Sequence, residues 1–570
     1  MKLSRKTATP VVLASVVALG LAGCAKSDRE TGSTGTSGST GSSATSGGGG
    51  GAASDTFTFG AAGAPEVFDP FYASDGETFR VTRQMMQGLL GIKDGTADPE
   101  PELAESWEPS ADGLSWTFKL RQGVKFTDGE TFNAEAVCYN FERMFTQNEV
   151  AAAGPAEYWA YTMGGFKGGK DDSLYKSCEV KDDATVVLNL TRVTSDFPVL
   201  LTLDSFSMQS PKALKDGDAN NVAKEGEGFK YPAYAMAPVG TGPYKLDKYD
   251  QANKTITLVR NDDYWGDKAK TAKLIFKIIP DESTRRQELE AGSINAYDLP
   301  NPVDWKALED GGNQVLVRPA FNILYMGFNP DKNPKLKDLR VRKAIYMALN
   351  REQMVQSQLP EGATVATQFM PDTVAGYNKD LQPVKYDPEG AKALLKEAGA
   401  EGMTLQFAYP SEVSRPYMPD PQKIHEALAA NLADIGIKVE AVTKPWNGGY
   451  LDGVDNGQFD AWLLGWTGDY NSANNFIGTF FSSDTNDFHT YANDWGKTLT
   501  SELRKADGVV DEAERTTTYE ALNKKIMEEY LPGLPISHSP PALVVGKGVS
   551  GVTASPLTAE MFDQVVVTKS

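Results

Sequence analysis

The stretch that decides the fold reads LAESW (residues 103–107), SWTFKLR (115–121) and GVKFTDGE (123–130). Two further blocks follow it, GTGPY (240–244) with YWG (264–266), and VRKAI (341–345) with NRE (350–352). The chain around these blocks alternates segments typical of strands and of helices. It shows no internal repeat of fixed period.

Three further segments predict strands. Polar and apolar residues alternate over Thr255-Ile256-Thr257-Leu258-Val259, as they do in a half-buried strand. Residues 439–442 and 462–464 also predict strands. Such segments separated by helices indicate a mixed α/β protein with more than one lobe.

Two helices carry their own start and stop signals. Asp387 and Pro388 supply an N-cap and a first-turn proline, and Gly399 ends that helix. A second helix is expected over 341–348, where Val341, Ala344, Ile345 and Ala348 share one apolar face. Asn350 with Gln353 predicts a capping pair for the helix after it.

The N-terminus predicts export and a lipid anchor. Lys2, Arg5 and Lys6 precede an apolar segment over 11–21, which is too short to span a bilayer as a helix. The sequence LAGC that ends at Cys24 resembles the lipobox of bacterial lipoproteins. That resemblance implies a signal peptide of residues 1–23 and acylation of Cys24. The alternative is an ordinary secretory signal that contains a cysteine by chance.

Residues 24–54 are mostly Gly, Ser, Thr and Ala, so we expect a disordered linker that acts as a tether. No later stretch of 18 apolar residues predicts a transmembrane helix.

The formal net charge of the 570 residues is −20. Such an acidic chain argues against binding to nucleic acid or to anionic membranes.

The cysteine count is informative once Cys24 is assigned to the lipid. Cys138 and Cys178 then remain as a pair in an oxidising compartment, where a disulfide is expected. The alternative is two buried free thiols. Neither cysteine has the neighbours of a nucleophile or of a metal site.

Signatures of catalysis are absent from the sequence. His425, His489 and His538 each lack a second ligand at metal-site spacing. Pro243 follows Gly240-Thr241-Gly242, so that glycine pair does not begin a helix that binds phosphate. We therefore predict no catalytic residue, metal or cofactor, although a hydrolase without a known signature is left open.

The three opening blocks resemble the large extracytoplasmic solute-binding proteins (family 5) of peptide ABC importers. The resemblance extends from about Phe57 to Val567. It implies a two-lobed α/β fold like that of periplasmic binding proteins (type II, large peptide-binding cluster), with hinge strands near 322–329 and 534–538. The implied parts are lobe 1 (55–98, 206–321 and 535–570), an extra subdomain beside it (99–205) and lobe 2 (322–534).

Two segments resemble the dipeptide-binding branch of this family. Residues 414–419 resemble the loop whose arginine, here Arg415, binds the terminal carboxylate of the peptide. Residues 465–470 resemble the segment whose aspartate, here Asp469, binds the terminal ammonium. A guanidinium and a carboxylate match the two ends of a zwitterionic peptide, and Trp466 would cover it with a flat apolar surface.

Weaker expectations complete the ligand-binding set: Gly468, Tyr470, Ser74, Gly76 and Trp446. Each main assignment has a structural alternative. Arg415 could pair with Glu412 or Asp420, Asp469 could make an Asx turn, and Trp466 could be ordinary core.

The sequence departs from the branch in two places. Residues 471–475 read NSANN where the family often has an acidic residue and a proline, and residues 152–170 form an insertion rich in aromatics and glycines. These departures leave the length of the peptide open.

The predicted function is therefore a monomeric, lipid-anchored receptor on the outer face of the cytoplasmic membrane. It would capture short peptides by lobe closure and deliver them to an ABC permease and its ATPase, without chemistry. The alternatives are a binder of nickel chelates, haem, glutathione or oligosaccharides on the same fold, and a surface lipoprotein that senses peptides.

Overall fold

The computed structural model describes residues 53–170, 172–226, 228–411, 413–483 and 485–568. The predicted signal peptide, the lipidation site at Cys24 and the linker through residue 52 lie outside the described residues. Ala53–Ser54 were expected to end the linker, but they form strand β1 and pair with β24 (Val566–Thr568). Within the described ranges, no helix has the length and apolar character needed to cross a bilayer.

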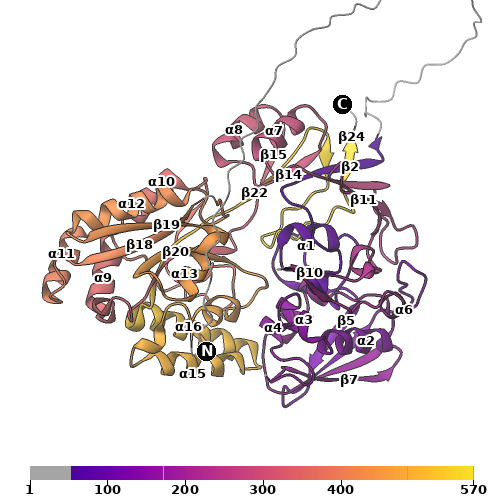
Figure 1. The fold of residues 1–570 in the computed structure, drawn as a ribbon, viewed down its shortest axis with the longest axis horizontal. Helices are drawn as coiled ribbons and strands as arrows, with labels where there is room; N and C mark the ends of the chain where they lie inside the picture. The colour runs from indigo at the N-terminus through magenta and orange to yellow at the C-terminus, as the bar shows by residue number, and fades with distance from the viewer. Residues whose placement is uncertain (1–52, 171, 227, 412, 484, 569–570) are drawn as a thin grey trace, which may run out of the picture. The chain divides into compact units, whose positions relative to one another are not determined.

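The first sheet has seven strands and joins distant parts of the chain (Figure 1). Its order is β11 (Tyr244–Asp250), β12 (Thr255–Arg260), β13 (Lys273–Ile278), β2 (Thr56–Ala61), β14 (Ala296–Asp298), β22 (Ala542–Val545) and β15 (Gln314–Val317). The strand predicted at 255–259 is β12, and Ile256 and Leu258 are buried in it as the alternation requires. We call the part of the chain built on this sheet the first lobe.

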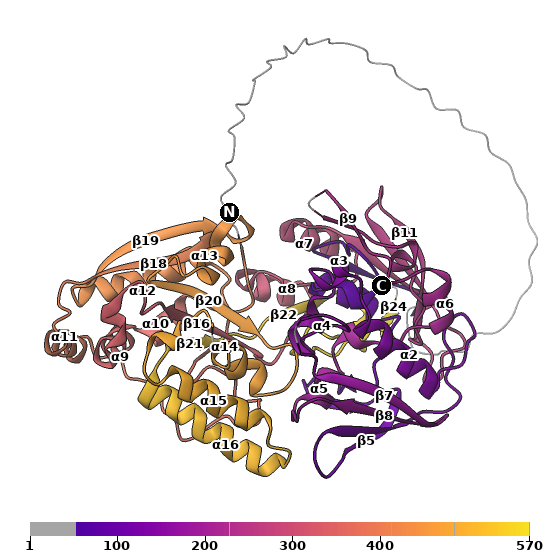
Figure 2. The same cartoon turned by 60° about the horizontal axis from the view of Figure 1, so that its bottom comes forward.

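A second sheet has four antiparallel strands, in the order β5 (Ala104–Pro109), β6 (Ser115–Leu120), β8 (Thr185–Leu190) and β7 (Tyr175–Asp182). Figure 2 shows these strands next to α2 (Ala134–Phe145), which packs on β7 and β8. The disulfide between Cys138 on α2 and Cys178 on β7 is present, with a Cα–Cα distance of 5.2 Å, and confirms the predicted pairing. We call this part the side subdomain.

The third sheet has six strands, in the order β17 (Thr364–Val365), β21 (Gly533–His538), β16 (Asn322–Phe328), β20 (Ala461–Thr467), β18 (Thr404–Ser411) and β19 (Lys438–Pro445). The strands predicted at 439–442 and 462–464 are β19 and β20 (Figure 1). We call the part built on this sheet the second lobe.

Both faces of the third sheet are covered by helices. Phe407 on β18 packs with α12 (Pro421–Asp434), where His425 Nε2 lies 3.1 Å from the Phe407 carbonyl oxygen. The next residue, Ala408, points to the opposite face and packs with Val454 on α13 (Leu451–Asp455). The sheet is thus covered on both sides at β18, whereas the edge strand β19 is largely exposed, and His425 has a structural role.

The predicted helix signals are confirmed. α11 (Pro388–Glu397) begins after Asp387, whose side chain accepts from the Gly390 N–H, and Gly399 follows it at φ +62°. The predicted apolar face of α9 (Leu339–Ala348) is buried. Asn350 caps α10 (Arg351–Gln358) by accepting from the Gln353 N–H.

The other α-helices and strands of the described residues complete the fold. The helices are α1 (Gly76–Thr82), α3 (Glu149–Ala152), α4 (Glu157–Thr162), α5 (Phe197–Leu200), α6 (Pro211–Asp216), α7 (Glu282–Glu290), α8 (Trp305–Asp310), α14 (Thr479–Phe481), α15 (Gly496–Asp507) and α16 (Glu512–Lys525). The strands are β3 (Leu90–Ile92), β4 (Pro99–Pro101), β9 (Ala223–Glu225), β10 (Gly228–Lys230) and β23 (Val549–Ser550).

Polar side chains join the side subdomain to the second lobe. Asp196 accepts from Ser472 Oγ at 2.6 Å and from Asn474 Nδ2 at 3.1 Å. Arg192 Nη1 lies 3.3 Å from Asp507 Oδ2. Helix α4 itself contacts the second lobe through Tyr158, which donates to Asp469 at 3.2 Å, and through Tyr161, whose hydroxyl lies 2.8 Å from Thr479 Oγ1.

Candidate ligand-binding site

A cavity of about 1130 Å³ is lined by residues from the first lobe, the side subdomain and the second lobe. The lining residues come from five segments: 74–80, 157–161, 415–417, 464–469 and 479–488, with single residues from elsewhere. Six of the predicted ligand-binding residues line it: Asp469, Arg415, Trp466, Trp446, Ser74 and Gly76. Gly468 and Tyr470 do not.

Asp469 follows the end of β20 and is held by hydrogen bonds on both sides. Its backbone N–H donates to Asn475 Oδ1 at 2.8 Å, and its carboxylate accepts from the Tyr158 hydroxyl at 3.2 Å. Burial raises the pKa of Asp469 to about 6, although the bonds from Tyr158 and Asn475 oppose the shift. No cation is paired with this carboxylate among the described residues, so it can accept a positive group from a ligand.

Arg415 has no carboxylate partner within the described part of the chain. Its guanidinium lies over the Trp446 ring, 4.3 Å from the centroid, and its Nε is buried without a hydrogen bond. The alternative partner Asp420 is paired with Lys423 at 2.9 Å, and Glu412 lies outside the described residues. An arginine stacked on an indole with free N–H groups is oriented to bind a carboxylate.

Trp466 and Gly468 shape the wall beside Asp469. Trp466 on β20 is half-buried, and its Nε1 donates to the same Asn475 Oδ1 at 3.4 Å. Gly468 donates to the Phe321 carbonyl at 3.0 Å, and a Cβ at Gly468 would collide with the rings of Phe321 and Phe476. Gly468 therefore serves close packing behind the cavity.

Tyr470 lies outside the cavity. Its side chain is buried with the hydrophobic core of the side subdomain, although its backbone belongs to the second lobe. It therefore contributes to the contact between these two parts.

Ser74 and Gly76 flank the start of α1. Asp75 between them caps the helix, accepting from the Thr78 N–H at 2.9 Å. Both flanking residues are exposed, and a Cβ at Gly76 would have open space around it. These residues place backbone groups at the first-lobe side of the cavity.

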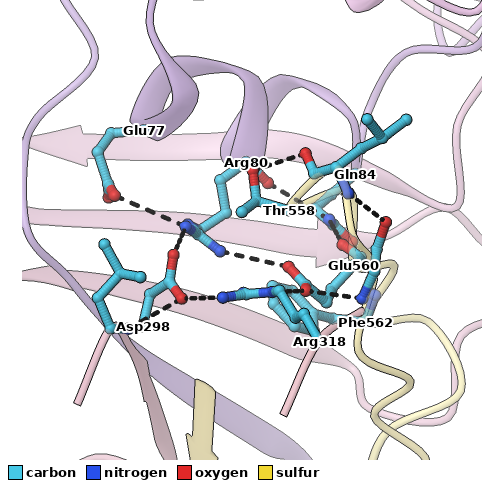
Figure 3. A network of polar contacts seen from close by, with 11 residues as sticks. Glu77, Arg80, Gln84, Asp298, Arg318, Thr558, Glu560 and Phe562 are labelled. Carbon is cyan, nitrogen blue, oxygen red and sulfur yellow. Dashed lines mark hydrogen bonds and ion pairs between the residues drawn. The ribbon is translucent and has the colours of Figure 1, made fainter. Parts of the chain in front are cut away.

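A buried network of charges lies behind that side (Figure 3). Arg80 on α1 pairs with Asp298, and Arg318 pairs with the same carboxylate at 2.6 Å. Glu560 completes the network, 2.7 Å from Arg318 Nε and 3.5 Å from Arg80 Nη1. Burial would raise the pKa of Asp298, but the two arginines outweigh it and lower that pKa.

The network includes Arg318, which lies between β15 and β16, where the chain passes from the first lobe to the second. Glu77 also belongs to it, with Oε1 3.7 Å from Arg80 Nη2 (Figure 3). Two arginines and the carboxylates of Asp298 and Glu560 balance one another. Each charged group of the network thus lies against at least one opposite charge, and Glu77 leaves the five residues with one net negative charge.

Several cavity residues were missed from sequence. Tyr158 lies in the insertion over 152–170. Asn475, which does not line the cavity but accepts from the Asp469 N–H, lies in the unusual stretch 471–475, so both fall in segments that depart from the family pattern. The aromatic residues Tyr325, Tyr417, Phe480 and Phe488 gave no signal, because a large aromatic side chain in a sequence usually belongs to the core. No group of three or more potential metal-binding side chains occurs within the described residues.

Residues 98–488 match the family described as "Bacterial extracellular solute-binding proteins, family 5 Middle". This protein belongs to that family. The match covers more than half of the chain and includes Arg415, Trp466 and Asp469. The three ordered blocks thus predicted the family correctly.

Individual relatives match this solute-binding protein over nearly its whole length. The dipeptide-binding protein of Escherichia coli (strain K12) is 32% identical over 525 residues, covering 90% of this chain and 94% of the relative. Heme-binding protein A of Haemophilus influenzae is 31% identical over 525 residues, covering 90% and 93%.

Solved structures confirm the predicted fold class. The dipeptide binding protein from Pseudoalteromonas sp. SM9913, in complex with Met-Leu, matches with a TM-score of 0.72 and 26% identity. The match covers 90% of this chain and 100% of that chain. The solute-binding protein therefore has the fold of the periplasmic binding proteins of family 5.

Proposed function

We propose that this protein is a lipid-anchored receptor that binds short peptides outside the cytoplasmic membrane and delivers them, chemically unchanged, to an ABC permease and its ATPase. The observation that carries the proposal is the pair of unmatched charges in one cavity. Arg415 offers a guanidinium, and Asp469 offers a carboxylate, and neither is paired with an opposite charge among the described residues.

A zwitterionic peptide matches this pair. Its ammonium replaces water at Asp469 and offsets the cost of burying that carboxylate, while its carboxylate can form two parallel hydrogen bonds with Arg415. Trp466 and Trp446 supply apolar surface beside these groups. Water-excluding walls strengthen both ion pairs, because a lower local dielectric weakens screening.

The ligand would also favour lobe closure. Asp469 and Arg415 belong to the second lobe, while Ser74 and Gly76 belong to the first lobe and Tyr158 to the side subdomain. A ligand that contacts all three parts binds best when they are together. It therefore shifts the population towards the closed state by its differential affinity.

Anchoring through Cys24 and a monomeric state complete the proposal. The resemblance of residues 21–24 to a lipobox and the Gly/Ser-rich residues 25–52 support a receptor held near the membrane by a tether. Replacing Cys24 by Ser should release the protein from the membrane fraction while leaving peptide binding intact. Retention of the Cys24→Ser variant in that fraction would contradict the lipid anchor.

The relatives whose names refer to dipeptides support a peptide as the ligand of this protein. The relative named for haem is the main rival, but no described residue that lines this cavity is a histidine. Direct ligation of a metal by imidazole therefore has no support from the lining residues.

Calorimetry on the soluble part of the chain tests the proposal. The affinity of the protein is measured for Met-Leu, for its N-acetylated form and for its C-amidated form. Each modification removes one charged end of the peptide. Both modified peptides should bind at least about 30-fold more weakly, because each leaves a charge in the cavity unpaired. Equal affinities for all three, or co-purification of haem or a metal chelate instead of peptides in native mass spectrometry, would refute it.

A further inference from the structure

The cavity has a further carboxylate, Asp487, which has no role in binding the peptide ends. Asp487 follows α14 and lines the cavity together with Asn486 and Phe488. It is half-buried, and no hydrogen bond or ion pair joins it to another described residue. Burial raises the pKa of Asp487 to about 6, and the second cause is the negative charge of Asp455. No cation of the described chain compensates this carboxylate.

Each of the other charged side chains described in the cavity wall has an ion-pair partner, an assigned role or an exposed position. Among the described lining residues, the acids are Asp75, Glu77, Glu157, Asp298, Asp469 and Asp487, and the bases are Arg80 and Arg415. Glu77 and Asp298 lie against Arg80, and Asp75 caps α1. Glu157 is exposed. With Asp469 and Arg415 assigned to the peptide ends, Asp487 is the half-buried acid among the described lining residues that has neither a partner nor a role.

Aromatic rings surround this part of the cavity. Tyr325 lies 5.2 Å from Phe480 and 5.1 Å from Phe488 between ring centroids, and all three residues line the cavity. The charge of Asp487 acts on the Tyr325 hydroxyl, whose pKa is raised first by burial and then by Asp487. Rings next to a carboxylate suit a side chain with an apolar stem and a cationic end.

We infer that Asp487 determines specificity by binding the cationic side chain of a peptide that contains lysine or arginine. The inference rests on the proposed peptide-binding function and adds a preferred substrate class to it. The aliphatic stem of the ligand residue would lie along Tyr325, Phe480 and Phe488, and its charged end would meet the Asp487 carboxylate.

Matched dipeptides test this subsite by calorimetry. Lys-Ala and Ala-Lys are compared with the analogues that carry norleucine in place of lysine, which keep the stem and lack the charge. In the wild-type protein, one of the two lysine peptides should bind about 10- to 100-fold more tightly than its norleucine analogue, since a partly desolvated charge pair contributes that much. In the Asp487→Asn variant, the affinities for the lysine peptide and for its norleucine analogue should differ by less than about threefold, which is the size of effect that exposed charges have.

A matched control separates a subsite from general attraction by an acidic cavity. Glu157→Gln removes the same charge from an exposed position of the wall, and it should keep the preference for lysine. Equal loss of preference in Glu157→Gln and Asp487→Asn would overturn the inference. Thermal melting of both variants checks that they remain folded.

The outcomes also distinguish this inference from the proposed function. If wild-type protein binds norleucine and lysine peptides with equal affinity, the subsite is refuted while peptide binding stands. If it binds none of the four peptides, the proposed function and the inference both fail. Tight binding of a lysine peptide that persists in Asp487→Asn would assign the cation to another acid and overturn the inference.

Discussion

Replacing Asp469 by Asn tests the ammonium site with little change in shape. The amide oxygen of Asn can still accept from the Tyr158 hydroxyl, and the backbone N–H still donates to Asn475. The variant therefore removes the negative charge and keeps the neighbouring hydrogen bonds. We expect it to weaken the binding of peptides that carry a free N-terminus.

The expected magnitude follows from the burial of Asp469. The pKa of about 6, against an ordinary value of 3.8, means that ionising this carboxylate costs about 3 kcal/mol more than in water. A ligand ammonium offsets that cost. Removing one member of such a pair costs roughly 2–5 kcal/mol, so the free-amine peptide should bind about 100-fold more weakly to the variant.

The N-acetylated peptide is the internal control. It brings no ammonium, so it should bind Asp469→Asn as well as the wild type or better, because no unpaired carboxylate remains. The opposite signs of these two effects separate a lost ion pair from general damage to the site. Calorimetry at pH 7.5 with Met-Leu and N-acetyl-Met-Leu measures both.

The pH dependence gives a second readout of the same group. The ammonium binds the ionised carboxylate, so wild-type affinity for Met-Leu should be constant above pH 6 and fall by about tenfold per pH unit below it. The variant should lack this fall. Equal losses for both peptides, or wild-type affinity that stays flat between pH 7 and pH 4.5, would refute the role of Asp469.

Four further predictions concern the second anchor and the stability of the fold. Arg415→Lys keeps the charge but loses the paired donors, so calorimetry should show roughly tenfold weaker binding of a free-carboxylate peptide and no change for its amide. Arg318→Met leaves two buried carboxylates with one partner fewer, and the free energy of unfolding in urea should fall by about 3–5 kcal/mol. Burial, followed by a neighbouring carboxylate, raises the pKa of Asp196, so its protonated form is favoured in the folded state and stability is lost as pH rises through that raised value. Calorimetric melting should therefore show the wild type more stable at pH 5.5 than at pH 8, and Asp196→Asn with a smaller difference. Replacing Cys138 and Cys178 by Ser should lower the unfolding free energy by about 3–4 kcal/mol, because the disulfide closes a loop with a sequence separation of 40; an unchanged urea midpoint would count against a stabilising role.

Local sequence signals predicted several helices and strands and the family. The caps at Asp387 and Asn350 and the alternation over residues 255–259 depend on neighbours in the chain, so they predicted α11, α10 and β12 correctly. The boundary of the linker was wrong by two residues, because Ala53–Ser54 pair with a strand from the opposite end of the chain.

The candidate site was predictable only in part. Resemblance to the family placed Arg415, Asp469 and Trp466, and all three line the cavity. Tyr470 was also expected there, but its side chain packs into the side subdomain. Side-chain direction after a strand depends on how the following loop is held, and Asn475 decides that for Asp469.

The sequence by itself determined the fold class, the family, the cysteine pair and the two residues proposed to anchor the ends of a peptide. Short-range patterning and ordered blocks carry that information, because each signal lies within a few residues.

Only the tertiary structure decided which charges are already paired. The network of Arg80, Asp298, Arg318 and Glu560 joins residues far apart in the chain, whereas Asp469 and Asp487 line the same cavity without a cation partner among the described residues. Whether a buried charge is satisfied depends on distances across the fold, which no local pattern specifies.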